Sequence, residues 1–449
     1  MSRKLFGTDG IRGKANTYPM TVDIALKVGK AAGIIFKNGS KKSKIVIGKD
    51  TRLSGYMIES ALAAGLLSMG LEVYFVGPMP TPAIAHITKS FAADAGVVIS
   101  ASHNPYEDNG VKFFDSQGFK LPDDVEEKIE QLALSELNTD NITGEDVGKA
   151  HRINDARGRY IEFAKNSIKN MSLKGLKIVL DCANGATYHV TKYILTELGA
   201  EVILKNTFPN GKNINERCGA MHPELLKDDV LLENADLAIA LDGDGDRVIM
   251  LDEQGQVVCG DTMMAIAALD MLREGKLKQN TLVTTVMSNL GLVKTIENAN
   301  GKVVRTRVGD RYVIEEMRNR GYNLGGEQSG HIIFLDHTTT GDGTISALQV
   351  LKIMKKTGQK LSELASVIKM YPQVMMNVDV KEKKPVEEMP SVFSKIKEIE
   401  QKLGSEGRVL VRYSGTSNKL RVMLEGKVKE EIENYANQIA EEVRKEIGV

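Results

Sequence analysis

The hydrophobic positions of this chain repeat a strand–helix–strand pattern three times. The first copy starts with the apolar run 44–50 (KIVIGKD), continues into a stretch with helical spacing, and ends in the apolar run 71–77. The same order recurs over 177–205 and over 281–309. Near-continuous apolar strands joined by a helix are typical of parallel βαβ units that are buried on both faces. The pattern therefore predicts three related α/β domains.

Each copy is followed by a third apolar run that ends in a polar loop. Run 95–100 leads into ASHNP, run 235–241 leads into DGDGDR, and run 322–325 leads into GEQSGH. Ligands of open α/β sheets bind beyond the carboxyl ends of the strands. We therefore expect each of the three domains to present one loop to a single central cleft.

The last part of the chain has a different pattern. From about Gln373, a strand is followed by an amphipathic helix that carries Val392, Phe393, Ile396, Ile399 and Leu403 on one face. Two strands, a polar loop and a final helix complete a smaller α+β domain. The fold class predicted is three mixed-sheet α/β domains plus this fourth domain. The expected domain ranges are 1–150, 151–256, 257–372 and 373–449.

Composition and charge narrow the function by exclusion. Lys and Arg number 59 and Asp and Glu number 59, so the formal net charge is zero. This balance argues against a chain that binds nucleic acid or an acidic membrane with its whole surface. The three cysteines are scattered, without zinc spacing, which favours a reducing compartment. No apolar run approaches the length of a membrane span, and the N-terminus lacks the apolar core of a signal peptide. We therefore expect a cytoplasmic protein.

The loop DGDGDR is the clearest candidate metal site. Asp242, Asp244 and Asp246 alternate with glycines, and alternate side chains of an extended backbone project to one side. Three clustered carboxylates repel one another unless a cation lies among them. An all-oxygen ligand set favours Mg²⁺ or Ca²⁺ over zinc.

Two other interpretations of this loop remain open. An EF-hand would use Glu253 at its twelfth position, but its sixth position is Arg247, where that loop needs glycine. The apolar flanks of the loop also indicate strands and not helices. A solvated acidic turn is the second alternative, because turns favour Asp and Gly.

The loop SASHNP at 100–105 contains the candidate nucleophile. Ser102 follows a buried strand, and serine attacks poorly unless a base or a metal assists it. A phosphorylated serine beside three aspartates and Mg²⁺ is chemically sensible, because the metal would stabilise the charge of an in-line transfer. The alternative is an ordinary turn in which His103 is a structural hydrogen-bonding residue. A Ser-His-Asp hydrolase is disfavoured because the chain has no GxSxG motif here.

The loop GEQSGH places Glu327, Ser329 and His331 within five residues. Glu327 and Ser329 are two apart and suit neighbouring hydroxyls of a sugar, while His331 suits a substrate group or a proton. The alternative is a Gly-rich turn with one structural histidine.

The loop at 412–421 (RYSGTSNKLR) is rich in hydrogen-bond donors and poor in groups that only accept. The donors are Arg412, Ser414, Thr416, Asn418 and Arg421. Together with a glycine that permits close backbone approach, they suit a phosphate group. The alternative is a hairpin turn between edge strands.

Further basic residues lie in Gly-rich loops at strand ends. Arg12 lies in GTDGIRG, and Lys49 and Arg52 lie in GKDTRLSG. Lys112 lies ten residues beyond Ser102 and precedes two phenylalanines, which predicts a half-buried amine whose pKa falls. Each residue alone is more often a surface charge, and their shared position is what suggests phosphate binding.

The four loops, in this order, resemble those of the α-D-phosphohexomutase superfamily. The resemblance covers essentially the whole chain and rests on FGTDGIRG at 6–13, SASHNPYEDNGVKFF at 100–114, DGDGDR, VGDRYV at 308–313 and GEQSGH. Within the superfamily the sequence is most similar to members that act on glucosamine phosphate. Members that act on mannose or glucose phosphates typically carry a different residue at the position of Gln328.

The resemblance implies four domains around one cleft and a cycle of phosphoryl transfer. Ser102 would be a phosphoserine that converts glucosamine 6-phosphate to a 1,6-bisphosphate, which then returns its other phosphate and leaves glucosamine 1-phosphate for UDP-N-acetylglucosamine and cell-wall synthesis. One Mg²⁺ would bind the Ser102 phosphate and the three aspartates. Glucosamine or glucose 1,6-bisphosphate would serve as activator, and a homodimer is expected.

The resemblance also implies roles for the remaining residues. Glu327 and Ser329 would bind sugar hydroxyls. The distal phosphate would be bound by Arg412, Ser414, Gly415, Thr416 and Arg421. The acid, base or electrostatic groups would be Arg12, Lys112, Arg247 and His331.

The chain departs from the family pattern in two places. Ser100 stands where the family commonly has threonine. The phosphate loop of the family commonly reads R-P-S-G-T-E-P, whereas this chain reads RYSGTSN. The roles of Tyr413, Ser417, Asn418 and Lys419 therefore stay open. A phosphomannomutase or phosphoglucomutase is the alternative within the family. A noncatalytic phosphosugar-binding protein is the alternative outside enzyme chemistry, and a Mg²⁺-dependent phosphatase would use similar parts.

Overall fold

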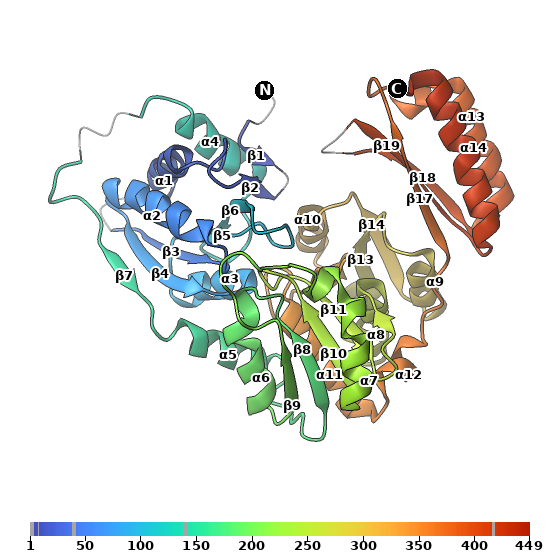
Figure 1. Cartoon of the computed structure of the whole chain (residues 1–449), viewed down its shortest axis with the longest axis horizontal. Helices are drawn as coiled ribbons and strands as arrows, with labels where there is room; N and C mark the ends of the chain where they lie inside the picture. Colours follow the sequence, from blue (N-terminus) through green and yellow to red (C-terminus); the bar gives the residue numbers. More distant parts are fainter. Residues whose placement is uncertain (1–3, 8, 38–41, 138–141, 415–417) are drawn as a thin grey trace. The chain divides into compact units, whose positions relative to one another are not determined.

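The structure is a computed structural model that describes residues 4–7, 9–37, 42–137, 142–414 and 418–449. The chain forms two compact units. The first contains Met1–Met287 with Ala299–Val367, and the second contains Ser288–Asn298 with Ile368–Val449. Three mixed α/β sheets belong to the first unit and one small antiparallel sheet to the second, which confirms the predicted fold class (Figure 1). Among the described residues, none of the helices is both long and apolar enough to cross a membrane.

The three large sheets share one strand order, which explains the threefold sequence pattern. The equivalent strands lie in the orders β4-β3-β5-β6, β9-β8-β10-β11 and β14-β13-β15-β16. In each set the first three strands are parallel, and the fourth is antiparallel to the third. Each chemistry-bearing loop therefore connects the last parallel strand to an antiparallel neighbour.

The strand bounds follow the predicted apolar runs closely. The first sheet contains β1 (Phe6–Gly7), β2 (Gly10–Lys14), β3 (Lys44–Lys49), β4 (Glu72–Pro78), β5 (Ala95–Ile99), β6 (Asp108–Asp115) and β7 (Ala150–Arg152). The second contains β8 (Lys177–Asp181), β9 (Glu201–Lys205), β10 (Leu237–Leu241), β11 (Val248–Asp252) and β12 (Val257–Val258). The third contains β13 (Thr281–Thr285), β14 (Lys302–Thr306), β15 (Leu324–Gly326) and β16 (Ile332–Phe334).

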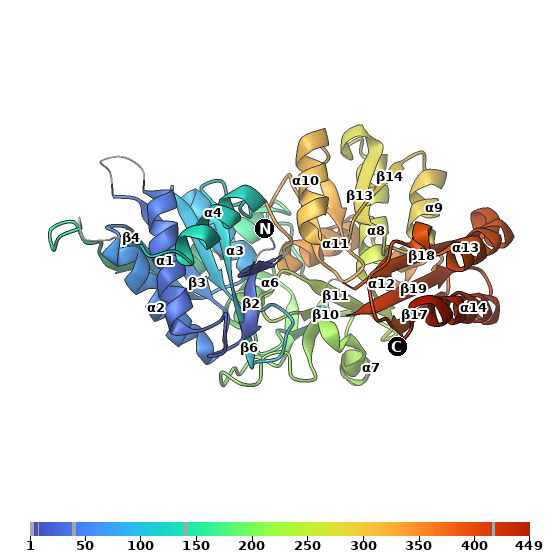
Figure 2. The same cartoon turned by 90° about the horizontal axis from the view of Figure 1, so that it is seen from above.

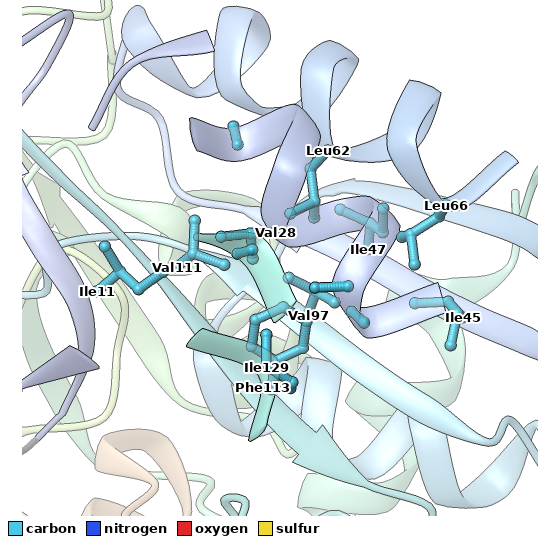
Figure 3. Packing of buried hydrophobic residues seen from close by; sticks show 14 of the residues in the cluster. Ile11, Val28, Ile45, Ile47, Leu62, Leu66, Val97, Val111, Phe113 and Ile129 are labelled. Carbon is cyan, nitrogen blue, oxygen red and sulfur yellow. The ribbon is translucent and has the colours of Figure 1, made fainter. Parts of the chain in front are cut away.

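Helices cover both faces of the first sheet. The helices α1 (Val22–Phe36) and α2 (Ser54–Ser68) lie side by side over one face, together with α4 (Asp123–Ala133) (Figure 1 and Figure 2). Figure 3 shows their buried side chains, among them Val28, Leu62 and Ile129, packed on Ile45, Ile47, Val97 and Phe113 of the strands. Because side chains alternate along a strand, Val46 and Val98 face the other side, toward α3 (Thr81–Ser90).

The second and third sheets are covered in the same way. The associated helices are α5 (Ala156–Asn166), α6 (Thr191–Glu197), α7 (Lys227–Glu233), α8 (Gly260–Arg273), α10 (Asp310–Arg320), α11 (Gly343–Thr357) and α12 (Leu361–Ala365). In the third sheet, Val313 and Met317 of α10 pack on Val283 and Ile333 of the strands. The buried helix α11 packs on α8.

The second unit is a three-stranded antiparallel sheet with helices on it. Its strands lie in the order β17 (Gln373–Asp379), β19 (Lys419–Glu425), β18 (Arg408–Tyr413), and its core is formed with α13 (Pro390–Leu403) and α14 (Lys429–Ile447). Phe393 was expected on the buried face of α13 but is 39% exposed, whereas Val392, Ile396 and Ile399 lie in the core and Leu403 packs against it.

The second unit also contains α9 (Leu290–Asn298), a helix that the repeat assigns to the third βαβ segment. Asn289, just before α9, accounts for this placement. Its amide donates to the carbonyl of Tyr371 at 2.9 Å and accepts from the Tyr371 N–H at 2.9 Å. A two-way hydrogen bond of this kind fixes the start of α9 to the segment that leads into β17.

A buried tyrosine–aspartate pair joins α5 to α11. The Tyr160 hydroxyl donates to Asp342, with its oxygen 3.0 and 2.9 Å from the two carboxylate oxygens, and Asp342 caps α11 by accepting from the Ile345 N–H at 2.9 Å. Both residues are almost fully buried. Burial raises the pKa of Asp342 to about 7, although the hydrogen bonds from Ile345 and Tyr160 oppose it. The neutral acid is therefore favoured in the folded chain.

This raised pKa predicts a pH-dependent contribution to stability. In the unfolded chain Asp342 loses its proton near pH 4, whereas in the folded chain it retains it until about pH 7. Stability should therefore fall as pH rises between these values. Asn at 342 keeps the capping oxygen without the charge, so the melting temperature of Asp342→Asn relative to the unmodified chain should rise from pH 5 to pH 8. Calorimetry at both pH values measures this, and a difference that does not change with pH would contradict the assignment.

Candidate active site

Ser102 lies in a strained turn just beyond β5. Its φ of 52° is in the left-handed region, which costs a residue other than glycine about 1–2 kcal/mol. The Ser102 N–H donates to the Ser100 hydroxyl at 2.9 Å. Its own hydroxyl is buried and donates to Asp242 at 2.7 Å. The turn therefore directs the serine oxygen at the aspartate loop of the second sheet.

Arg52 and Asn215 fix the backbone of this turn. The Ser102 carbonyl accepts from the Arg52 guanidinium at 2.9 Å and from the Asn215 amide at 2.8 Å. Arg52 is fully buried, pairs with Asp50 at 2.8 Å and also donates to the carbonyls of Asn104 and Pro105. All three of its guanidinium nitrogens donate to neighbouring groups of the first domain, so Arg52 supports the turn, in contrast to the phosphate-binding role expected from its basic loop.

Lys49 of the same basic loop is also engaged within its own domain. Its amine forms an ion pair with Glu59 and lies 4.4 Å from the centre of the Tyr56 ring. The phosphate-binding interpretation of 48–55 therefore receives no support from the positions of its two basic side chains.

The three aspartates of the DGDGDR loop converge on one point. Asp242, Asp244 and Asp246 are buried, and each offers a carboxylate oxygen within 4.8 Å of the other two. The loop joins the antiparallel strands β10 and β11, so the helix–loop–helix frame of an EF-hand is excluded. Gly243 is required here, because a Cβ at this position would lie 2.7 Å from the Ser102 carbonyl oxygen.

The triad has the chemistry of a cation site. One oxygen of Asp244 accepts from the Thr81 hydroxyl at 2.7 Å, but its other oxygen is buried without a hydrogen-bond partner among the described residues. Burial and then the charges of Asp246 and Asp244 raise the pKa of Asp242 well above its usual range. Burial also opposes ionisation of Asp246, but the charges of His331 and Lys112 hold its pKa well below that range. An oxygen-preferring divalent cation fits this carboxylate set and would compensate its charge.

Lys112 is inserted from β6 between the triad and Asp9. Its amine is 3.1 Å from Asp9, 3.5 Å from Asp244 and 3.9 Å from Asp246, and its side chain is 2% exposed. The sequence predicts a half-buried lysine with a lowered pKa, and the structure corrects both points. Burial does lower the pKa of Lys112, but the carboxylates of Asp9 and Asp244 overcome it, so the pKa lies above its ordinary value.

Arg12 and Arg247 flank the same region from two loops. Arg12 of β2 forms an ion pair with Asp9, and the Arg247 N–H donates to Asp242 at 3.1 Å. The Nε groups of both arginines are buried without a hydrogen-bond partner in the described part of the chain. These donors are available to an anionic group near Ser102.

His331 lies between two carboxylates of different domains. Its Nδ1 is 3.6 Å from Asp246, and its Nε2 is 3.4 Å from Asp310 and accepts from the Gly341 N–H at 3.1 Å. Burial lowers the pKa of His331, but Asp246 and Asp310 outweigh it and raise the pKa above its ordinary value. His331 is therefore oriented toward the triad and does not point away as an isolated core histidine.

Glu327 and Ser329 lie on the turn between β15 and β16. Glu327 accepts from the Gly309 N–H at 3.1 Å and from the Ser329 hydroxyl at 3.4 Å. Both side chains are half-buried. A Cβ at Gly330 would lie 2.1 Å from the Val248 carbonyl oxygen, so this turn lies directly against the start of β11. The candidate sugar-binding residues Glu327 and Ser329 therefore lie on a turn that contacts β11, the strand that follows the aspartate loop.

His103 shows no sign of acting as the base of a hydrolase. Its Nδ1 is 3.5 Å from the Ser102 oxygen, at the limit of a hydrogen bond. Burial and the charge of Arg247, then that of Arg12, lower the pKa of His103 to about 4. The serine hydroxyl is directed instead at Asp242.

The phosphate-loop candidates lie in the second unit. Arg412 and Arg421 are paired directly opposite each other on β18 and β19. Neither forms an ion pair within the described residues, the Arg421 Nε is buried without a partner there, and burial and then Arg421 lower the pKa of Arg412. Ser414 is buried at the end of β18. Gly415, Thr416 and Ser417 lie outside the described residues, and the roles of Asn418 and Lys419 stay open.

Sequence reasoning missed four residues of this site. Asp9, Thr81, Asn215 and Asp310 each contact a predicted site residue. Asp9 and Asp310 lie inside motifs that were noticed, GTDGIRG and VGDRYV, but a lone aspartate in such a motif carries no distinguishing signal. Thr81 is the first residue of α3 and Asn215 lies in a loop, and the pattern of strands places neither of them.

Profiles of known families match the chain in four consecutive parts. They are the phosphoglucomutase/phosphomannomutase α/β/α domain I at 3–140, domain II at 158–255, domain III at 259–371 and the C-terminal domain at 375–442. The four domain ranges expected from the sequence are close to these, but the exact boundaries stay a prediction.

Curated relatives match over the whole length. A phosphoglucosamine mutase of Citrifermentans bemidjiense is 58% identical over 448 residues, which cover 99% of both chains. A phosphoglucosamine mutase of Anaeromyxobacter sp. is 55% identical over 454 residues, covering 100% of this chain and 97% of the relative.

Solved structures share the fold at low identity. A phosphoglucomutase/phosphomannomutase family protein of Burkholderia thailandensis matches with a TM-score of 0.82 at 22% identity, covering 100% of both chains. An Aspergillus fumigatus N-acetylphosphoglucosamine mutase in complex with GlcNAc-6P and magnesium matches with a TM-score of 0.69 at 20% identity, covering 99% of this chain and 96% of the other. From its four matched domains and its full-length relatives, the chain belongs to the phosphoglucomutase/phosphomannomutase family of the α-D-phosphohexomutase superfamily.

Proposed function

We propose that this chain is an isomerase that interconverts glucosamine 6-phosphate and glucosamine 1-phosphate through a phosphoserine at Ser102 and a 1,6-bisphosphate. The observation that carries the proposal is the buried Ser102 hydroxyl, 2.7 Å from Asp242 within a cluster of three aspartates. The full-length relatives named phosphoglucosamine mutase support the choice of sugar.

The proposed cycle transfers one phosphoryl group out and one back. The Ser102 phosphoryl group passes to the free hydroxyl of the sugar monophosphate, which loses its proton. The bond between phosphorus and the serine oxygen breaks, and that oxygen takes up a proton. The bisphosphate then presents its other phosphate, the Ser102 oxygen attacks that phosphorus, and the sugar–oxygen bond to phosphorus breaks. A glucosamine or glucose 1,6-bisphosphate would load Ser102 by the same second step.

We propose Mg²⁺ as the ion of the triad, held by Asp242, Asp244, Asp246 and the Ser102 phosphate. When bound, it would neutralise phosphoryl oxygens and stabilise the charge of the transfer. The all-carboxylate donors and the unpartnered Asp244 oxygen support this choice. The relative from Aspergillus fumigatus was solved with magnesium.

We assign the remaining residues from their positions. Lys112 is a buried cation beside the triad, so it would stabilise negative charge and could give a proton to the leaving oxygen. The unpartnered Nε groups of Arg12 and Arg247 suit phosphoryl oxygens. His331 would donate from its triad-facing nitrogen.

The substrate contacts are assigned in the same way. Glu327 and Ser329 would bind sugar hydroxyls. Arg412, Ser414 and Arg421, with Gly415 and Thr416, would bind the distal phosphate, because two opposed arginines that have no acidic partner among the described residues favour a dianion. A homodimer remains a prediction from the family resemblance.

Replacing Ser102 by alanine should abolish mutase turnover. The variant has no oxygen to carry the phosphoryl group, so intact-mass measurement after incubation with glucose 1,6-bisphosphate should show no phosphorylated species. Ser60→Ala changes an exposed serine of α2 and serves as the matched control. Near-normal turnover by Ser102→Ala would exclude the phosphoserine mechanism.

Replacing Asp244 by asparagine should weaken Mg²⁺ dependence and slow transfer. Asparagine preserves the size of the side chain but removes a ligand charge, so kcat should fall by about two orders of magnitude and the Mg²⁺ midpoint should rise. Asp228→Asn on the exposed side of α7 is the control. An unchanged Mg²⁺ titration in Asp244→Asn would remove the triad from the mechanism.

Comparison of three sugars tests the proposed substrate. We expect kcat/KM for glucosamine 6-phosphate to exceed that for glucose and mannose 6-phosphates by at least about tenfold, because hydrogen bonds made to an amino group are not satisfied by every analogue. Coupled assays on the three substrates measure the ratios. A preference for either neutral sugar would replace the proposed substrate and leave the family assignment in place.

A further inference from the structure

Six ionisable side chains, one of which is Asp246 of the triad, form a closed ring in which basic and acidic groups alternate. The separations between charged atoms around the ring are 3.1 Å for Lys112 to Asp9, 2.6 Å for Asp9 to Lys120, 2.5 Å for Lys120 to Asp310, 3.4 Å for Asp310 to His331, 3.6 Å for His331 to Asp246 and 3.9 Å for Asp246 to Lys112. Every side chain of the ring is at most 24% exposed. Ion pairs in such surroundings are screened less by water and salt than surface pairs.

The ring connects all three large sheets. Asp9, Lys112 and Lys120 belong to the first sheet or to the loops that flank its strands, Asp246 belongs to the second, and Asp310 and His331 belong to the third. Asp310 opens α10, and His331 precedes β16. Each sheet therefore contributes charges that depend on the other two.

Lys120 differs from the other members of the ring because, within the described residues, it contacts neither Ser102 nor the triad nor any residue assigned to an electrostatic or proton-transfer role. Its amine contacts Asp9 on one side and Asp310 on the other. Asp9 in turn contacts Lys112 and Arg12, and Asp310 contacts His331. Lys120 is thus one residue removed from three of the four groups assigned to electrostatic or proton-transfer roles.

Loss of this amine would leave two half-buried carboxylates facing each other. Both Asp9 and Asp310 form hydrogen bonds to Lys120. Without the cation between them, like charges in a site of low dielectric constant would repel, and the carboxylates would move apart or take up protons. Either response would change the position of Lys112 and Arg12 at one end and of His331 at the other.

The surrounding interface has other contacts that do not need Lys120. The Thr339 hydroxyl donates to the Gly118 carbonyl at 2.5 Å, the Arg318 guanidinium lies 4.0 Å from the Phe119 ring centre, and Arg311 pairs with Glu126 at 2.7 Å. These contacts join the loop after β6 and the start of α4 to the third domain. Removal of the Lys120 amine should therefore leave the two domains docked, which separates positioning from folding.

We propose that Lys120 is a positioning residue for phosphoryl transfer: it holds Asp9 and Asp310 in place and thereby sets the positions of Lys112, Arg12 and His331. The inference deepens the proposed mutase function and rests on it. The step concerned is attack of the Ser102 oxygen on a sugar phosphate. The serine hydroxyl loses its proton as its oxygen bonds to phosphorus, the phosphorus–oxygen bond to the sugar breaks, and the sugar oxygen takes up a proton.

The test compares Lys120→Met, Lys120→Arg and the control Lys128→Met. Methionine keeps the length of the side chain without its charge, and Lys128 is an exposed lysine of α4 that pairs with Asp124 on the same helix. We expect Lys120→Met to lower kcat by about 10- to 100-fold, since small displacements of catalytic groups have effects of that size. KM for glucosamine 6-phosphate should change by less than about threefold, because the Lys120 amine contacts Asp9 and Asp310, neither of which is assigned to substrate binding. Lys120→Arg should recover part of kcat, and Lys128→Met should match the unmodified chain.

Two further measurements exclude a merely structural effect. The rate at which glucose 1,6-bisphosphate phosphorylates Ser102, followed by intact mass, should fall with kcat while the fraction of chains finally phosphorylated stays unchanged. A folding defect would instead lower that fraction and the melting temperature. A double-mutant cycle combines Lys120→Met with Asp310→Asn. The fold loss of kcat in the double variant should be smaller than the product of the two single fold losses, because Asp310→Asn removes one of the two carboxylates that repel each other.

The outcomes distinguish this inference from the proposed function. If the unmodified chain converts glucosamine 6-phosphate and Lys120→Met keeps kcat within about twofold, the positioning role is wrong and the function stands. A Lys120→Arg variant no better than Lys120→Met would also overturn it. If the unmodified chain is never phosphorylated and converts none of the three sugar phosphates, the proposed function has failed, and the role of Lys120 fails with it.

Discussion

The repulsion among three buried carboxylates is the constraint on which the rest of the site depends. At the separations within the triad, each pair of full charges would cost about 3 kcal/mol even at an effective dielectric constant of 20. The fold brings Lys112 from the first sheet, Arg247 from the second and His331 from the third toward these charges. That compensation is incomplete, since one oxygen of Asp244 has no partner in the described part of the chain. A divalent cation bound among the three carboxylates would complete this compensation.

The backbone around the triad explains why the aspartates can be held so close together. The carbonyl of Gly243 accepts from the Ala186 N–H, that of Asp244 accepts from the Thr81 N–H, and that of Gly245 accepts from the Gly343 N–H. Three consecutive carbonyls thus bind three different segments of the first unit. A loop fixed from all sides cannot relax its charges by moving outward, so its geometry is set before any ligand arrives. Such preorganisation is what phosphoryl transfer requires of a protein, because the chemistry itself needs mainly positioning and charge stabilisation.

The sequence predicts the fold and the location of the chemistry better than it predicts how individual charges are used. Near-continuous apolar runs indicated the parallel strands, and the loops that follow the third strand of each set carry the chemistry. The antiparallel fourth strands were weaker signals, because a short buried strand such as Ile332–Phe334 has no periodicity of its own.

The placement of α9 depended on hydrogen bonds of Asn289 that no pattern reveals. The use of Arg52 and the raised pKa of Lys112 depended on partners distant in sequence, Ser102 for one and Asp9 for the other. Pairing of charges across sheets is a property of tertiary structure, and composition at one loop does not determine it.

The proposed reaction places different requirements on the site near Ser102, where the phosphoryl group is transferred, and on the site that binds the distal phosphate. A bisphosphate intermediate must present first one phosphate and then the other to Ser102, so the group that binds the distant phosphate has to accept either end of the sugar. In the proposed role, the opposed Arg412 and Arg421 would recognise the charge and oxygens of a phosphate and make no distinction between the carbon atoms that carry it. The site near Ser102, by contrast, must transfer the phosphoryl group to the sugar and not to water. A loop fixed by buried hydrogen bonds and ion pairs suits this requirement. A tolerant distal site and a rigid reacting site are therefore two consequences of the same chemical cycle, and the second explains why so many buried charges surround a single serine.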